Sequence, residues 1–333
     1  MTSDDICAAV PGALNQQVLH LWRRQCTEWP RLGEGLAALK RSVTRSFDVG
    51  GSRVLAQWNP ARVVSTGAKI DAASLAARPC FLCAANRPPE QRGIMYREAW
   101  LILCNPAPIF DPHFTIVSTA HEPQRIVPYL EPLLSLARDL NGRYTVFYNG
   151  PLCGASAPDH MHFQAAPAGG TPFETELAAQ LCADRNQNGQ RWIEWIRRDA
   201  VRVGVTRPSR RPMVLVVGAE IDRVEHTLHE VVDAFGAVHP AEPEPMLNLF
   251  ATWAEDRWLA WVYPRRAHRP TIYGHGPDEY LISPGAVDLA GLLITPRQSD
   301  FERIGAPIIE RVYEQVLLSP SKFAQIRERL TAS

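Results

Sequence analysis

The chain has 333 residues, which is enough for two compact units, because single hydrophobic cores usually stop growing at roughly 250 residues. Hydrophobic residues make up 46% of the chain and charged residues 21%, as in soluble globular proteins, so a disordered or fibrous chain is excluded. Lys plus Arg and Asp plus Glu each number 35, and no long run of one charge provides the electrostatic attraction that duplex binding needs. We expect no nucleic-acid partner, although local arginines can still bind small anions.

The N-terminal residues MTSDDICAAV are acidic and do not form a basic stretch followed by an apolar core. Nowhere do about 18 consecutive apolar residues occur, as a membrane-spanning helix requires. The 7 cysteines are an odd number scattered along the chain, which favours free thiols and a metal site over a set of disulfides. We therefore expect a cytoplasmic protein without a membrane partner.

In the N-terminal part, apolar residues recur at helical spacing in residues 14–22 and 128–140, which predicts two amphipathic helices. Runs of β-branched and aromatic residues predict strands. Two strands flank Gly50 and Gly51, and others are expected at residues 100–103, 114–117, 144–148 and 160–164. Two polar helices are expected between residues 173 and 201.

The run VTRPSRRP at residues 205–212 predicts a linker, so we place two domains at residues 1–204 and 205–333. The second part predicts strands at residues 213–217, 247–253, 257–263 and 292–295, and a helix at residues 220–235. A final helix is expected to begin at Ser319 and Pro320. This order indicates an α+β fold of two halves, each an antiparallel sheet flanked by helices.

The segment NGPLCGASAPDHMHFQ contains the residues that are candidates for catalysis and phosphate binding. In a strand, side chains at alternate positions share a face, so His160, His162 and Gln164 are expected on one surface, with the residues between them in the core. Upstream, Gly150, Gly154 and Ser156 provide small residues and exposed backbone N–H groups, which can form an anion-binding nest beside the histidines.

Taken alone, two histidines in a His-x-His pair favour an ordinary exposed edge strand. They gain significance from the adjacent glycine-bearing loop, because a phosphate held there would lie within reach of an imidazole. An imidazole attacks phosphorus when one ring nitrogen is unprotonated and the other N–H is held by an acceptor. The pattern therefore also fits nucleophilic catalysis.

Residues 149–164 resemble the active-site strand of the transferase branch of the histidine-triad (HIT) superfamily, which includes diadenosine-tetraphosphate phosphorylases, GDP-galactose phosphorylases and galactose-1-phosphate uridylyltransferases. The resemblance implies that His162 forms a covalent nucleotidyl-histidine and that Gln164 bonds the transferring phosphoryl group. It also implies that Ser156 and Asn149 contact phosphate oxygens. The glutamine at position 164 is typical of the transferase branch, since the hydrolase branch usually has a third histidine there.

The resemblance extends over roughly residues 50–310. The segment CNPAPIFDPHFTIVSTAHEPQ is similar to the one that precedes a helix in dinucleoside-polyphosphate phosphorylases, with Asn105, His113 and Gln124 at matching positions. The segment LISPGAVDLAGLLITPRQSDF resembles their C-terminal, ATP-adenylyltransferase-like domain. It implies two HIT-like halves, of which the second lacks the His-x-His pair.

The expected activity is nucleotidyl transfer in two steps, from a nucleoside-diphosphate sugar or a dinucleoside polyphosphate to phosphate or a sugar phosphate. Further candidates for phosphate binding follow the second predicted strand: Asn59, Arg62, Ser65 and Lys69. For Arg62 and Lys69, solvated surface charge is an equally good interpretation. A HIT-type hydrolase and a non-catalytic, zinc-stabilised nucleotide-binding protein remain alternatives. No organic cofactor is expected, and a homodimer is compatible with the resemblance.

Cys80 and Cys83 form a Cys-x-x-Cys pair, a spacing that lets two thiolates meet one tetrahedral ion. A redox pair is the competing interpretation, but it needs a helix at the motif, and Pro88 and Pro89 follow too closely. In uridylyltransferases of the superfamily a zinc ion is held by such a pair, a histidine just past a strand, and the first histidine of the His-x-His pair. The resemblance thus implies a structural zinc held by the residues Cys80, Cys83, His121 and His160.

Three other histidines are open to interpretation. His113 is a rival of His121 as metal ligand and is equally a candidate for substrate contact. His268 and His275 lie in the basic segment PRRAHRPTIYGHG, which either reaches the base or the acceptor or is plain solvated surface.

Overall fold

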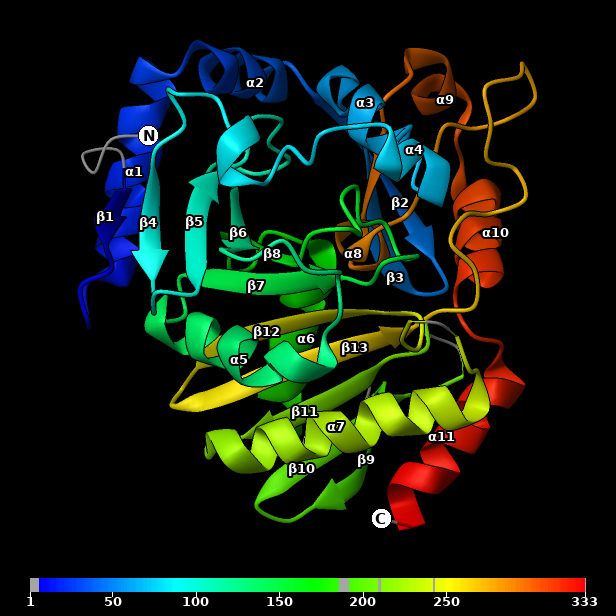
Figure 1. Ribbon diagram of the computed structural model, residues 1–333. Helices are drawn as coiled ribbons and strands as arrows, with labels where there is room; N and C mark the ends of the chain where they lie inside the picture. Colours follow the sequence, from blue (N-terminus) through cyan, green and yellow to red (C-terminus); the bar gives the residue numbers. More distant parts are fainter. Residues whose placement is uncertain (1–5, 186–191, 209–210, 242, 333) are drawn as a thin grey trace.

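A large sheet forms the centre of the computed structural model (Figure 1), which describes residues 6–185, 192–208, 211–241 and 243–332. Its 11 strands lie in the order β1-β4-β5-β6-β8-β7-β12-β13-β11-β10-β9. Neighbours are antiparallel except for the parallel pair β1–β4. In this spatial order the strands are Ile6–Ala8, Gly93–Tyr96, Trp100–Cys104, Phe114–Ser118, His162–Pro167, Tyr144–Asn149, Leu247–Ala254, Arg257–Pro264, Val214–Gly218, Val201–Thr206 and Ile193–Arg198.

The two parts of the chain share this sheet, because β7 pairs with β12 over four residue pairs that include Asn149 opposite Asn248. The α+β class is confirmed, but the expectation of one separate sheet in each half is wrong. Pairing β7 with β12 leaves neither strand with an open edge of unsatisfied N–H and C=O groups.

Helices pack one face of the large sheet and bury the main hydrophobic core against it. They are α1 (Leu14–Glu28), α2 (Pro30–Lys40), α5 (Leu130–Asp139), α7 (Ile221–Val238) and α11 (Pro320–Ala332). Alternate residues of each strand enter this core, and those between them face the other way, as the period of a strand requires. Met161 and Phe163 enter it, as predicted.

The other face of the large sheet packs against a second layer. That layer contains a 3-stranded sheet of β2 (Val43–Val49), β3 (Ser52–Trp58) and β14 (Leu292–Thr295), together with α6 (Pro172–Arg185), α8 (Ala286–Leu289), α9 (Gln298–Arg303) and α10 (Ala306–Val316). Strand β14 comes from the second part of the chain and pairs in parallel with β3 from the first. The halves are therefore interleaved in both layers.

Short helical turns occupy several loops: η2 (Pro60–Arg62), α3 (Val63–Thr66), α4 (Ala72–Ala76), η3 (Ala84–Asn86) and η4 (Val127–Tyr129). None of the described helices is long and apolar enough to cross a membrane.

The region after α6 differs from the prediction. The second polar helix expected before residue 201 is wrong, since β9 and β10 pair there as antiparallel strands. Ile193, Val203 and Val205 are buried, so their pairing into the sheet overrides the polar composition. Residues 186–191 lie outside the described residues, as do residues 209 and 210 of the expected linker. The expected boundary after residue 204 falls inside β10.

Candidate active site and metal centre

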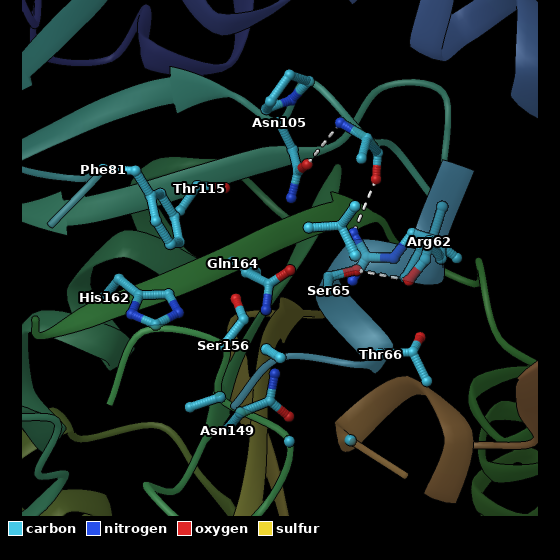
Figure 2. A pocket seen from close by; sticks show the side chains of 18 of the residues that line it. Arg62, Ser65, Thr66, Phe81, Asn105, Thr115, Asn149, Ser156, His162 and Gln164 are labelled. Atoms are coloured by element: carbon cyan, nitrogen blue, oxygen red, sulfur yellow. Dashed lines mark hydrogen bonds between the residues drawn. The ribbon is translucent and has the colours of Figure 1, made fainter. Parts of the chain in front are cut away.

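A cavity of about 1070 Å³ opens between the large sheet and the second layer. Its wall includes most of the residues that the sequence pointed to, namely Arg62, Ser65, Lys69, Asn105, Asn149, Gly154, Ser156, His162 and Gln164. Figure 2 labels all of these residues except Lys69 and Gly154. His162 and Gln164 alternate with Phe163 on β8, which places both on the cavity face of the strand. The structure thus gathers residues that lie far apart in the sequence.

The His162 ring is 5% exposed, and one nitrogen is fixed by the backbone. Its Nδ1 lies 2.8 Å from the carbonyl oxygen of His160. A carbonyl can only accept, so Nδ1 carries the proton and donates it, which leaves Nε2 with its lone pair. Nε2 has no hydrogen-bond partner among the described residues, and burial lowers the pKa of the ring to about 4. The ring therefore presents an unprotonated nitrogen at the cavity wall.

Gln164 is oriented by His113, which is fully buried. The Ile109 backbone N–H donates to His113 Nδ1 at 3.2 Å, so the proton of the neutral ring lies on Nε2. That Nε2 lies 3.0 Å from Gln164 Oε1 and donates to it. Burial, with a contribution from nearby Arg62, lowers the pKa of His113 to about 3, which keeps this arrangement at neutral pH. The amide nitrogen of Gln164 is left to face the cavity.

Asn149 is oriented in the same way by two donors. The Ala286 backbone N–H and Asn248 Nδ2 both donate to Asn149 Oδ1, at 2.7 and 2.9 Å. The amide nitrogen of Asn149 has no partner in the described part of the chain, and Figure 2 shows it directed toward Ser156 and Gln164. Two amides and one hydroxyl thus surround the space in front of His162.

The glycine-bearing loop holds Ser156 close to the second part of the chain. Gly154 has a φ of +96°, and a Cβ there would lie 2.5 Å from the Gly285 Cα, so only glycine fits this contact. Gly150 lies behind the wall, where its N–H donates to the Leu247 carbonyl at 3.1 Å. Of the glycines predicted to bind phosphate, only Gly154 reaches the cavity.

The loop after β3 provides a polar wall of the cavity. Arg62 Nη1 donates to the Ala107 carbonyl at 2.8 Å, and Ser65 Oγ donates to the Arg62 carbonyl at 3.1 Å. Burial lowers the pKa of Arg62 to about 10, so the side chain remains a cation at neutral pH. Lys69 is exposed at the cavity. Asn59, by contrast, is fully buried behind the wall and donates to the Pro108 carbonyl at 3.3 Å, so it supports the cavity rather than lining it.

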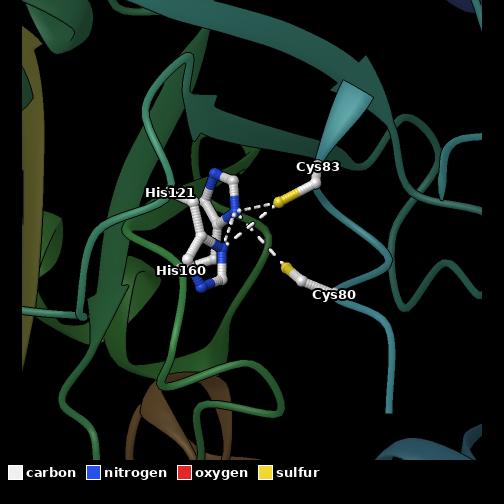
Figure 3. Close-up of side chains that lie close together, drawn as sticks. All are labelled: Cys80, Cys83, His121 and His160. Carbon is white, nitrogen blue, oxygen red and sulfur yellow. Dashed lines mark hydrogen bonds between the residues drawn. The ribbon is translucent and has the colours of Figure 1, made fainter. Parts of the chain in front are cut away.

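Beside the cavity, four ligand atoms of Cys80, Cys83, His121 and His160 lie within 4.8 Å of one another (Figure 3). The sulfur–nitrogen and nitrogen–nitrogen distances that join them are 3.2 to 3.5 Å. A tetrahedral ion with bonds of about 2.0 Å to nitrogen and 2.3 Å to sulfur separates its ligands by roughly 3.3–3.8 Å. The cluster therefore has the donor set and the spacing to hold a metal ion.

His160 does not share the cavity face with His162, contrary to the prediction, because it precedes β8. Its Nε2 lies 2.9 Å from the Ser118 carbonyl and donates to it, which leaves Nδ1 for a metal. His121, rather than His113, is the other imidazole of the cluster. The backbone carbonyl of His160 in turn accepts the proton of His162 Nδ1, so His160 links the cluster to the ring at the cavity wall.

Residues 21–167 match the model of a family described as a domain of unknown function, DUF4922. No curated protein matches the sequence. Among solved structures, yeast Ap4A phosphorylase Apa2 in complex with Ap4A is 16% identical at a TM-score of 0.55, covering 90% of this chain and 98% of that chain. The same yeast enzyme in complex with AMP is 15% identical at a TM-score of 0.50, covering 87% of this chain and 96% of that chain.

The chain has the fold of this Ap4A phosphorylase. The resemblance to the transferase branch of the histidine-triad superfamily is thereby confirmed at the level of the fold. The likeness covers both parts of the chain, in agreement with the breadth of the sequence resemblance.

Several cavity residues were missed by the sequence analysis. Arg78 donates to Asp159 at 2.9 Å and lies over the ring of Phe81, which is 49% exposed at the cavity. Both residues lie next to the Cys-x-x-Cys pair in the sequence, and this proximity to a candidate metal site could have indicated them. The second part of the chain contributes a further group of lining residues, which includes His268, Arg269, Ser283 and Asp288. Of the two histidines left open there, His268 lines the cavity, whereas His275 is exposed elsewhere.

Proposed function

We propose that this chain is a nucleotidyltransferase in which His162 forms a covalent nucleotidyl-histidine intermediate. The observation that carries the proposal is the His162 ring, whose Nδ1 proton is held by the His160 carbonyl while Nε2 faces the cavity. An imidazole in this state needs no general base to attack phosphorus. The fold shared with an Ap4A phosphorylase supports the same reaction class.

The reaction consists of two displacements. In the first, His162 Nε2 attacks the α-phosphorus of the nucleotide, an N–P bond forms, and the bond to the leaving phosphate oxygen breaks. In the second, an oxygen of phosphate or of a sugar phosphate attacks the same phosphorus, and the N–P bond returns its electron pair to Nε2. The Nδ1 proton stays on the ring, held by the His160 carbonyl.

Charge on the phosphoryl oxygens is met by donors whose orientation is already set. Gln164 and Asn149 cannot rotate their amides without losing the hydrogen bonds to their oxygens. Such prearranged donors stabilise a transition state more than mobile ones do, because no reorganisation accompanies the reaction. Arg62 and Lys69 add positive charge to the wall. The substrate that donates the nucleotidyl group is a nucleoside-diphosphate sugar or a dinucleoside polyphosphate.

We propose that the metal of the cluster is zinc and that its role is structural. Two thiolates and two imidazoles fill a tetrahedral shell, so no position is left for substrate. The cluster joins the Cys80–Cys83 loop to the segments that carry His121 and His160. It thereby fixes the backbone carbonyl on which the His162 ring depends.

The proposal is tested by incubating the chain with labelled dinucleoside polyphosphates and nucleotide sugars, followed by intact mass measurement. We expect one nucleoside monophosphate to be added per chain, in an acid-labile, base-stable linkage. Added phosphate or sugar phosphate should then release a nucleoside diphosphate or a nucleotide sugar. Release of the monophosphate by water alone would contradict the transferase assignment, and the absence of an adduct with every donor would contradict the proposed mechanism.

A further inference from the structure

The second part of the chain has no His-x-His pair, yet it contacts the proposed site through one buried side chain. Asn248 on β12 is fully buried and lies directly opposite Asn149 on β7. Its Nδ2 donates to Asn149 Oδ1 at 2.9 Å and to the Cys153 carbonyl at 2.8 Å. Asn248 therefore holds both a cavity-facing amide and the loop that leads to Ser156.

The orientation of Asn248 is itself determined by its neighbours. Arg265 Nη1 lies 3.2 Å from Asn248 Oδ1, and a guanidinium can only donate. The Cys153 carbonyl can only accept, so it requires the nitrogen of Asn248 on its side. If the Asn248 amide were flipped, it would lose both of these hydrogen bonds. The orientation of Asn248 is therefore set by a guanidinium that can only donate and a carbonyl that can only accept, and Asn248 in turn sets the orientation of Asn149.

Arg265 is an unusual residue in this position, because it is 1% exposed and its described hydrogen bonds include no carboxylate. Its other acceptors are the backbone carbonyls of Pro284, Ala267 and His268, at 2.6 to 2.9 Å. A buried charge is costly unless its hydrogen bonds are well satisfied. Arg265 thus ties Asn248 to two backbone segments that border the cavity wall.

We propose that Asn248 and Arg265 are positioning residues, which fix the amide of Asn149 with its nitrogen toward the transferring phosphate. This inference rests on the proposed function. It assigns the second half of the molecule a role in the reaction, because Asn248 and Arg265 of that half orient the hydrogen-bond donor Asn149 of the first half.

Asn248→Asp provides a sharp test because it keeps the shape of the side chain and the acceptor for Arg265. A carboxylate cannot donate, so Asn149 Oδ1 and the Cys153 carbonyl each lose one donor and face an oxygen instead. Asn149 then either suffers this repulsion or turns its own oxygen toward the phosphate. We expect adduct formation at a saturating nucleotide concentration to fall about 100-fold, as for the loss of one prearranged hydrogen-bond donor. The nucleotide concentration needed for half-saturation should change little.

A double-mutant cycle shows whether the effect passes through Asn149. In an Asn149→Ala background, Asn248→Asp should reduce adduct formation no more than about threefold, because interacting residues are not additive. An equal reduction in both backgrounds, or no reduction in either, overturns the inference. The affinities for AMP and GMP, measured by calorimetry over the same four proteins, should change little, and a loss of affinity as large as the loss of adduct formation overturns the inference too.

Two controls separate a local effect from a damaged fold. The Asn248→Asp protein should unfold within a few degrees of the original chain, since the new carboxylate pairs with Arg265. If Asn248→Asp unfolds at a clearly lower temperature, Arg265→Lys takes its place in the cycle. An equally large loss of adduct formation by Arg265→Lys in the Asn149→Ala background then overturns the inference. An unaltered chain that binds nucleotide without forming an adduct contradicts the proposed function, whereas an additive cycle contradicts only this inference.

Discussion

His160 and His162 are two residues apart and both donate one ring proton to a backbone carbonyl, but they use opposite nitrogens. His160 donates from Nε2 to Ser118 and keeps Nδ1 for the metal cluster, whereas His162 donates from Nδ1 to His160 and keeps Nε2 for the cavity. Because a carbonyl accepts and never donates, each carbonyl decides which nitrogen keeps its lone pair. In the proposed function, the same residue type is thus a metal ligand at one position and the nucleophile at the other.

In both rings, the backbone carbonyl therefore selects which nitrogen is available for chemistry. His160 is also the residue through which the two sites meet, since its ring enters the metal cluster and its carbonyl holds His162. A change on the metal side is therefore expected to reach the nucleophile, and a change of the nucleophile should leave the metal side intact.

Replacement of His162 should have the largest effect on activity. His162→Asn removes the attacking nitrogen, and we expect turnover to fall by at least about 10⁴-fold, as when other enzymes lose a nucleophile. Adduct formation should disappear from the intact mass spectrum, while the metal content stays unchanged. His275→Asn, at an exposed position, is the matched control and should retain full activity. An adduct that survives His162→Asn would place the nucleophile elsewhere.

Removal of the metal tests the other side of the comparison. Cys80→Ser should prevent the ion from binding and destabilise the fold on the order of 4 kcal/mol, because the cluster joins three segments of the chain. Turnover should fall as well, since the His160 carbonyl is no longer fixed. Metal content by elemental analysis and unfolding in urea check both effects. Cys7→Ser, at an exposed cysteine, should change neither. Equal zinc content in the two variants would exclude the cluster as the metal site.

Much of the site was predictable because its signals are local. Strand alternation placed His162 and Gln164 on one face. The spacing of Cys80 and Cys83 pointed to a metal site, the family resemblance implied His121 and His160 as its other ligands, and the structure brings these four residues together. The strand prediction extended too far at its start, so His160 was placed on the wrong surface. The turn before β8 is what separates the two histidines, and turn geometry is not visible in the pattern.

The remainder depends on contacts between distant segments. Asn248 and Arg265 carry no local signal, since their importance arises only from the pairing of β7 with β12. The same pairing turned two expected sheets into one. Phe81 and Arg78 meet the cavity because a loop folds over it, and neither belongs to a periodic element. Sequence patterns specify the faces of single elements, whereas the cavity wall is a property of their assembly.

The orientation of Gln164 provides a smaller test of the cavity side. Gln164→Leu keeps the approximate volume and removes the amide nitrogen that faces the cavity, so we expect kcat to fall by about 100- to 1000-fold, or about 3–4 kcal/mol of transition-state stabilisation. The KM for the nucleotide substrate should change much less, because the hydrogen bond from Gln164 acts mainly on the transition state. Gln298→Leu, on the exposed side of α9, is the matched control. A change confined to KM would show that Gln164 binds the ground state and the transition state equally.

The smallest expected effect concerns His113, which is buried and neutral in the folded chain with a pKa of about 3, against about 6.5 in an unfolded chain. Between these values the unfolded chain binds a proton that the folded chain does not, so the free energy of unfolding decreases as the pH falls. The contribution of His113 is about 1.4 kcal/mol per pH unit, or roughly 2 kcal/mol between pH 6.5 and pH 5. His113→Gln removes the titrating group, and its unfolding in urea should lose that much of the pH dependence. His275→Gln should retain the full dependence. Equal slopes in all three proteins would mean that His113 binds a proton in the folded state as readily as in the unfolded chain, so that its Nδ1 no longer accepts from the Ile109 N–H.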